Sequence, residues 1–176
     1  MAIQLFITNQ KSGWTRLWSL QNHKGKVKKT FSYRMFILNE SGSVREFEVS
    51  RDALVPTFIK RKQSKYGIDG EAPPNKIQKP YNARIRTDGK KGFRLELYES
   101  GVGKKNNKNV ILGTGKVLRK HIQIHIGPGC SEGCFLLTGW TKGREKFKRA
   151  IKQMIVQDKS RGIKKAEEFI VRVEKR

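Results

Sequence analysis

Apolar residues recur at every second position in several short runs of this chain, and at a helical spacing in only one place. The clearest run, H-I-Q-I-H-I over residues 121–126, places an isoleucine at every even position. Successive side chains of a strand point to opposite faces, so the isoleucines would face a core. His121, Gln123 and His125 would then share the opposite face.

Other segments repeat the strand pattern. Residues 30–49 and 80–98 each read as a hairpin, with turns at 40–43 and at D-G-K-K-G, and residues 168–173 alternate as a last strand. Residues 143–158 instead predict a helix, whose apolar face is Phe147, Ala150, Ile151, Met154 and Ile155. We therefore expect a mainly β domain with one packed helix, an α+β fold.

The length of 176 residues predicts a single domain over 1–176. Residues 1–70 form an N-terminal β portion whose role the sequence does not fix. Residues 75–158 hold the histidine and cysteine motif together with the predicted helix. The Gly- and Pro-punctuated stretch 60–80 between these regions reads as a basic excursion from one sheet.

The composition is strongly basic, with 39 Lys and Arg against 15 Asp and Glu and a formal net charge of +24. A field of that sign attracts polyanions such as nucleic acid, teichoic acid, anionic lipid or an acidic protein. No apolar run approaches the roughly 18 residues of a membrane span, and no secretory signal is visible. We expect synthesis in the cytoplasm, with a non-classical route of export or release if the protein acts on the cell wall.

The segment 120–140 carries the residues with the most distinctive chemistry. A strand ends at His125, and a glycine-rich turn then delivers Cys134. A thiol on a sharp turn beside a histidine is the arrangement expected of a nucleophilic cysteine, with the imidazole as its base. Backbone amides near Gly133, with Ser131 as a neighbour, are candidates for the oxyanion hole.

Three other interpretations of these residues stay open. The spacing H-x3-H-x4-C-x3-C, formed by His121, His125, Cys130 and Cys134, supplies ligands of the right kinds for zinc. It requires the two histidines to converge on a helix, whereas the isoleucine pattern favours a strand, where His121 and Gln123 become rim residues of the cysteine site. The cysteines are expected as free thiols, although a disulfide between them and a plain packing role are alternatives.

The motif resembles the signature of the L,D-transpeptidase-like catalytic fold, and also a family of small phage-associated domains with I-H-x-G and G-C-I-L-x-G. Ile124 to Gly127 matches the first half, and Gly133 to Leu137 with Gly139 matches the second. Two features depart from the pattern. Phe135 stands where the family has an arginine that meets a substrate carboxylate, and the interval between histidine and cysteine is short.

This resemblance implies a β-rich fold and a cysteine enzyme that acts on peptidoglycan stem peptides. Carried over by position, Cys134 is the nucleophile and His125 the base, and no cofactor is needed. The activity would be that of a transpeptidase, carboxypeptidase or amidase in a phage lysis factor or an antibacterial effector, the latter with an acidic immunity protein as partner. The alternative is a non-catalytic basic module for nucleic acid or a phage structural partner, with aromatics such as Tyr66, Tyr81 and Trp140 beside lysines.

Overall fold

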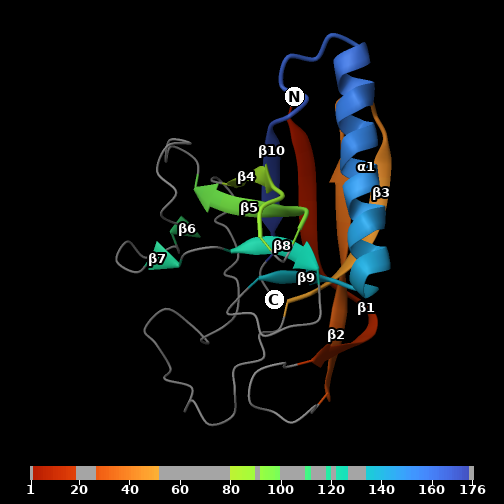
Figure 1. Cartoon of the computed structure of the whole chain (residues 1–176), viewed down its shortest axis with the longest axis vertical. Coiled ribbons are helices and arrows are strands. Elements are labelled where there is room, and N and C mark those ends of the chain that lie inside the picture. Colours follow the sequence, from red (N-terminus) through yellow and green to blue (C-terminus); the bar gives the residue numbers. More distant parts are fainter. Residues whose placement is uncertain are drawn as a thin grey trace.

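The computed structural model contains a closed β-barrel and one long helix that packs along it (Figure 1). It describes residues 2–18, 27–51, 80–89, 92–99, 110–111, 118–119, 122–126 and 134–174. The prediction of a mainly β chain with one packed helix is confirmed. Closure of the strands into a barrel is a further finding, which the alternating pattern alone does not predict.

Eight strands close the barrel in the order β1-β10-β4-β5-β8-β9-β3-β2. Their bounds are β1 Ile3–Trp18, β2 Val27–Leu38, β3 Val44–Ser50, β4 Tyr81–Arg86, β5 Arg94–Glu99, β8 Gln123–Ile126, β9 Phe135–Leu137 and β10 Phe169–Val173. Strands β6 (Val110–Ile111) and β7 (Leu118–Arg119) form a separate two-stranded sheet.

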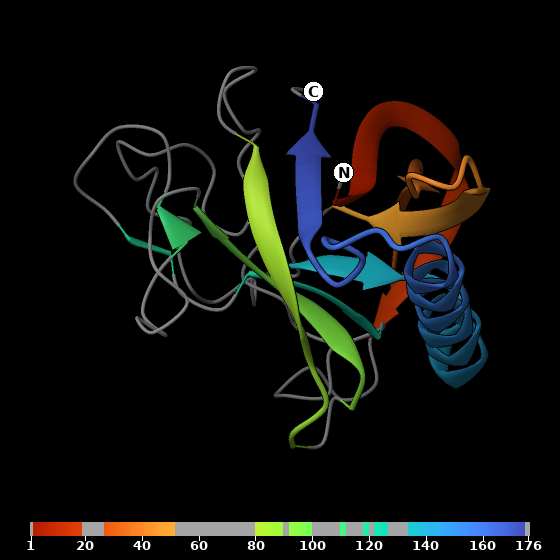
Figure 2. The same ribbon diagram turned by 90° about the horizontal axis from the view of Figure 1, so that it is seen from above.

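Two parallel pairings join the antiparallel hairpins into the closed barrel. Strand β10 lies between β1, to which it is parallel, and β4, to which it is antiparallel. Strands β8 and β9 are also parallel. Both predicted hairpins are confirmed, β2 with β3 and β4 with β5. Seen from above, α1 lies outside the strands, next to β3 (Figure 2).

The core lies between the inner faces of the strands and one face of the helix. It is formed by aliphatic and aromatic side chains from every barrel strand and from α1, among them Ile3, Leu5, Ile7, Met35, Ile37, Val49, Leu95, Ile124, Phe135, Phe147 and Val171. The predicted helix face is confirmed, because Phe147, Ala150, Ile151 and Met154 are all buried. The rings of Phe47 and Phe93 meet that of Phe147 edge to face, at 5.4 and 6.0 Å between centroids.

Helix α1 spans Trp140–Ser160 and therefore begins earlier than the predicted range 143–158. The difference arises at Gly143, whose N–H donates to the carbonyl of Gly139 at 2.9 Å. A Cβ atom at Gly143 would lie 1.8 Å from the carbonyl oxygen of Thr138. Gly143 therefore does not mark the start of the helix. It lies inside the first helical turn, where the carbonyl of Thr138, just after β9, leaves no room for a side chain.

The other end of the helix is fixed to the β2–β3 turn by one buried carboxylate. Asp158 is fully buried, and its Oδ1 accepts hydrogen bonds from the backbone N–H and the hydroxyl of Ser41, at 3.1 and 2.7 Å. The amide of Asn39 donates to the carbonyl of Met154 at 3.4 Å. The predicted turn at 40–43 is confirmed, and these bonds hold it against α1.

A buried arginine follows the end of β3. Arg51 is 1% exposed, and its guanidinium donates to the carbonyls of Thr8 at 3.0 Å and Glu174 at 2.6 Å. Its Cζ lies 5.5 Å from the centre of the Tyr33 ring. Carbonyl oxygens and a ring face are partners that make a buried guanidinium tolerable, so Arg51 ties β1, β2 and the end of β10 together.

Candidate active site

The site is organised by the parallel pair β8 and β9. Their register pairs Ile124 with Phe135 and His125 with Leu136. Paired residues on neighbouring strands point to the same face of a sheet. Ile124 and Phe135 belong to the barrel core, so His125 and Leu136 lie together on the outer face.

Cys134 joins His125 on this outer face. It stands one residue before β9 and packs with Leu136 in a small cluster separate from the main core. The same register sets Cys134 level with Gln123, one position back along each strand. In ideal sheet geometry the Cα atoms of Cys134 and His125 are then about 8 Å apart, a diagonal distance across which an aromatic side chain can reach.

The outer face of this strand pair is buried, unlike that of most barrels. The exposed fractions are 4% for Gln123, 4% for His125, 7% for Cys134 and 2% for Leu136. Strands buried on both faces are usually apolar on both. An amide, an imidazole and a thiol on such a face carry a desolvation cost that purely structural positions avoid.

The position of the His125 ring defines which nitrogen can act as a base. Its Nδ1 lies 2.6 Å from the carbonyl oxygen of Ile126, the next residue. A carbonyl oxygen can only accept a hydrogen bond, so the neutral ring carries its proton on Nδ1. The other nitrogen, Nε2, is buried and holds a lone pair in this tautomer.

Gln123 adds a polar group to the same face. Its side-chain oxygen Oε1 is buried without a hydrogen-bond partner among the described residues. Across to β5, Gln123 is in register with Glu96. The rim position predicted for Gln123 stays a prediction, and the register sets this residue level with Cys134.

A buried carboxylate next to Gln123 is neutralised by two arginines. Arg84 donates from Nε and Nη2 to one Glu96 oxygen, at 2.9 and 2.6 Å, and Arg86 donates to the other at 3.0 Å. Arg94 and Glu96 alternate along β5 with the core residues Leu95 and Leu97, so they share the face opposite the core. Their proximity to the histidine and cysteine follows from the pairing of β5 with β8, which no local pattern reveals.

This ion network extends to the β4–β5 turn. Arg86 also holds Asp88 through two hydrogen bonds, at 2.6 and 2.9 Å. The hydrogen bond from Arg86 keeps the pKa of Asp88 well below its usual range, and Asp88 in turn raises the pKa of Arg86. Both groups are therefore charged at all ordinary pH values.

Several predicted site residues lie outside the described part of the chain: Gly133, Ser131, His121 and Cys130. The oxyanion-hole prediction and the predicted rim position of His121 therefore stay predictions, and so does the four-residue zinc site. Among the described residues, no three His, Cys, Asp or Glu side chains are grouped as metal ligands. Cys134 is a buried thiol.

The position that the resembling family fills with arginine is occupied by a core residue. Phe135 is fully buried and faces Ile124 inside the barrel. Alternation along β9 sends the side chain after Cys134 inward, away from the sulfur. A residue at position 135 therefore does not meet a substrate on the outer face.

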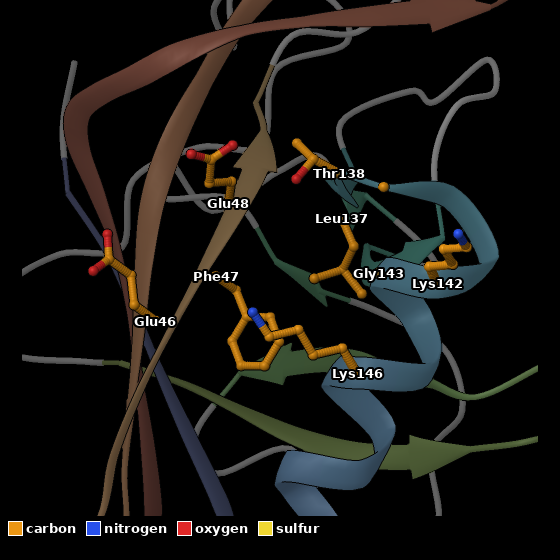
Figure 3. Close-up of a pocket in the computed structure, with 9 residues that line it drawn as sticks. Glu46, Phe47, Glu48, Leu137, Thr138, Lys142, Gly143 and Lys146 are labelled. Carbon is orange, nitrogen blue, oxygen red and sulfur yellow. The ribbon is translucent and has the colours of Figure 1, made fainter.

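A separate pocket lies between β3 and the start of α1 (Figure 3). It has a volume of about 510 Å³, and its walls include Phe47, Leu137 and Lys146 but neither Cys134 nor His125. Figure 3 shows Lys146 across Phe47, with its ammonium 5.7 Å from the ring centre. Glu46 and Glu48 also line the pocket, on the side opposite Lys142 and Lys146.

No family model, curated protein or solved structure matches this chain. Within the described ranges, no helix combines the length and the apolar character needed to cross a lipid bilayer. A function is therefore inferred from the side chains of the site.

Proposed function

We propose that this protein is a cysteine-dependent acyl-transfer enzyme of the L,D-transpeptidase-like type that acts on peptidoglycan stem peptides. The observation that carries the proposal is the parallel register of β8 and β9. It sets Cys134 and His125 on one buried face of neighbouring strands. Ile124–Ile126 of the first motif lie in β8, and Phe135–Leu137 of the second form β9.

In the proposed reaction, Nε2 of His125 accepts the proton of the Cys134 thiol. The thiolate then attacks the carbonyl carbon of a peptide bond, and backbone amides around Gly133 stabilise the oxyanion. The imidazolium returns its proton to the departing amine as the C–N bond breaks, which leaves a thioester on Cys134. Water or a second amine releases the acyl group, giving hydrolysis or transpeptidation.

The state of His125 supports this assignment of roles. A base must present a lone pair to the thiol, and the short contact from Nδ1 to the Ile126 carbonyl fixes that lone pair on Nε2. The carbonyl also stabilises the imidazolium that forms when the proton is taken. Burial of both groups keeps water away from the thiolate and strengthens its attraction to the imidazolium.

The basic surface favours an anionic substrate. Stem peptides and the wall polymers around them carry carboxylates and phosphates, which a net charge of +24 attracts over long distances. The buried Phe135 means that a substrate carboxylate must be met by another residue than the one after the nucleophile. We therefore propose the chemistry of the resembling family with a different carboxylate contact.

The test is cleavage or cross-linking of purified sacculi, followed by separation of the released muropeptides. Cys134→Ala should lower the activity at least about a thousandfold, because the nucleophile is lost, while Cys130→Ala should leave it unchanged. A thioester adduct on Cys134, found by mass spectrometry, identifies the intermediate. Equal activity of the wild type and Cys134→Ala would reject the proposal.

The role of His125 is tested by the reactivity of the thiol with iodoacetamide between pH 5 and 9. In the wild type, alkylation at neutral pH should be fast, because the imidazole takes up the thiol proton. His125→Gln should slow it, with the unfolding free energy little changed. Identical profiles for the two proteins would show that the imidazole does not act on Cys134.

A further inference from the structure

Strands β1 and β2 continue beyond the barrel as a two-stranded ribbon. Strand β10 pairs with β1 only over Ile3–Ile7, and β3 pairs with β2 only from Ser32 onward. Among the described residues, Trp14–Trp18 and Val27–Phe31 pair only with each other. This ribbon therefore exposes surfaces that the barrel portions of the same strands bury.

One face of the ribbon carries aromatic rings interleaved with ammonium groups. Trp14 and Phe31 are paired in register, and their ring centroids are 3.8 Å apart in a stacked arrangement. The Nζ of Lys11 lies 3.8 Å from the centre of the Phe31 ring, and that of Lys29 lies 4.7 Å from the centre of the Trp14 ring. These four residues, the ribbon stack, run in the order cation, ring, ring, cation.

The ribbon stack is exposed where a structural cluster would be covered. Trp14 is 55% exposed, and both lysines are exposed as well. Met35 and Tyr33 are buried on one face of β2. Phe31 and Lys29 continue this face beyond the barrel, two and four residues before Tyr33. Trp14 lies between the Phe31 ring and the Lys29 ammonium, and about half of its surface stays open to solvent, so a flat aromatic ligand can reach it.

We propose that the ribbon stack binds single-stranded nucleic acid. Unpaired bases would stack on the Trp14 and Phe31 rings, and the lysine ammoniums would move from the ring faces to backbone phosphates. Lysine side chains are long and flexible, so this exchange replaces one cation contact by a stronger one with a phosphate. The net charge of +24 draws the polyanion to the surface, and the stack supplies the local contact.

The aromatic content favours a single strand over other polyanions. Duplex bases are stacked on one another and leave no ring face for Trp14. Inorganic polyphosphate and phosphate-rich wall polymers offer charge but no rings. Base stacking on an exposed indole is therefore the feature that separates this ligand from the rest.

The test is fluorescence anisotropy of a labelled oligothymidylate of about 15 nucleotides, titrated with the full chain. Trp14→Ala should weaken binding about tenfold or more, as expected for the loss of a stacking ring. Trp140→Ala is the matched control, because Trp140 is also half exposed, at 50%, but lies at the start of α1. It should bind as the wild type does, which would assign base stacking to the ribbon and not to Trp140, the exposed aromatic that the sequence also offered for nucleic acid.

The lysines are tested through the salt dependence of the same titration. Lys29→Gln should reduce the slope of log Kd against log salt by about 0.7 for the one lost phosphate contact. Lys152→Gln, on the exposed face of α1, removes the same charge and should leave the slope unchanged. Circular dichroism of each variant confirms that the fold is kept.

Three outcomes would overturn the proposal: equal affinities of Trp14→Ala and Trp140→Ala, binding of a duplex as tight as that of the single strand, or equally effective displacement by inorganic polyphosphate. Each would mean that charge alone holds the polymer. None depends on Cys134, so failure here leaves the enzymatic proposal untouched.

Discussion

The inner and outer faces of the β8–β9 pair are buried to the same degree but differ completely in chemistry. Ile124 and Phe135, on the inner face, are fully buried among other apolar side chains. On the outer face, His125 and Cys134 are almost as buried, although their heteroatoms lose hydration there. The inner face stabilises the barrel through this burial, whereas the outer face buries an imidazole and a thiol at a cost in desolvation.

Two successive side chains at the start of β9 differ in the same way. Phe135 follows Cys134 directly, yet the pleat sends one into the core and the other to the outer face. Ile124 and Phe135, packed in the core, therefore hold the neighbouring His125 and Cys134 in place. Substitutions on the two faces should then affect different measurements.

The largest effect on stability is expected on the inner face. Phe135→Ala should lower the free energy of unfolding by about 3–5 kcal/mol, because a fully buried ring is lost from the core. Cys134→Ala, one residue away, should lower it by only about 1 kcal/mol. Urea unfolding of both variants measures the difference, and equal losses would mean that Cys134 serves mainly for packing.

A smaller effect is expected for the buried amide beside the thiol. Gln123→Met removes a buried polar group at similar volume, so the free energy of unfolding should change by less than about 1 kcal/mol or rise. Muropeptide release should fall, because the amide level with Cys134 is lost. A destabilisation of several kcal/mol with normal activity would assign Gln123 to the structure instead of the site.

The smallest effect is expected at the end of the outer-face ion network. The hydrogen bond from Arg86 lowers the native pKa of Asp88, so the carboxylate stabilises the fold above the unfolded value of about 3.9. That contribution is lost as the pH falls through the lower native pKa. Asp88→Asn should flatten the acid side of a urea midpoint series slightly, since Asp88 is exposed, and leave thiol reactivity unchanged. A strong change in reactivity would place the network inside the site.

Local patterns predicted the elements well and their assembly poorly. The isoleucines of β8, the two hairpins and the apolar face of α1 are set by periodicity, which depends only on neighbours along the chain. The parallel pairing of β8 with β9 and the position of β10 beside β1 depend on residues far apart in sequence. Nothing in the spacing of His125 and Cys134 reveals the register that puts them on one face.

The aromatic stack of the β1–β2 ribbon was also beyond local reasoning. Trp14 and Phe31 become neighbours only through cross-strand pairing, and a register shift between Lys11 and Gly13 decides which residues meet. The sequence does show Trp14 and Phe31 near lysines, which is the only local sign of this stack. The alternation needed to place them was obscured by this irregularity of β1.

The position of β10 in the barrel affects how the chain folds during translation. The sheet has its gap between β1 and β4 until Phe169–Val173 is made, because this strand alone bridges them. Until then, the facing edges of β1 and β4 are unpaired. Such open strand edges can pair with other nascent chains.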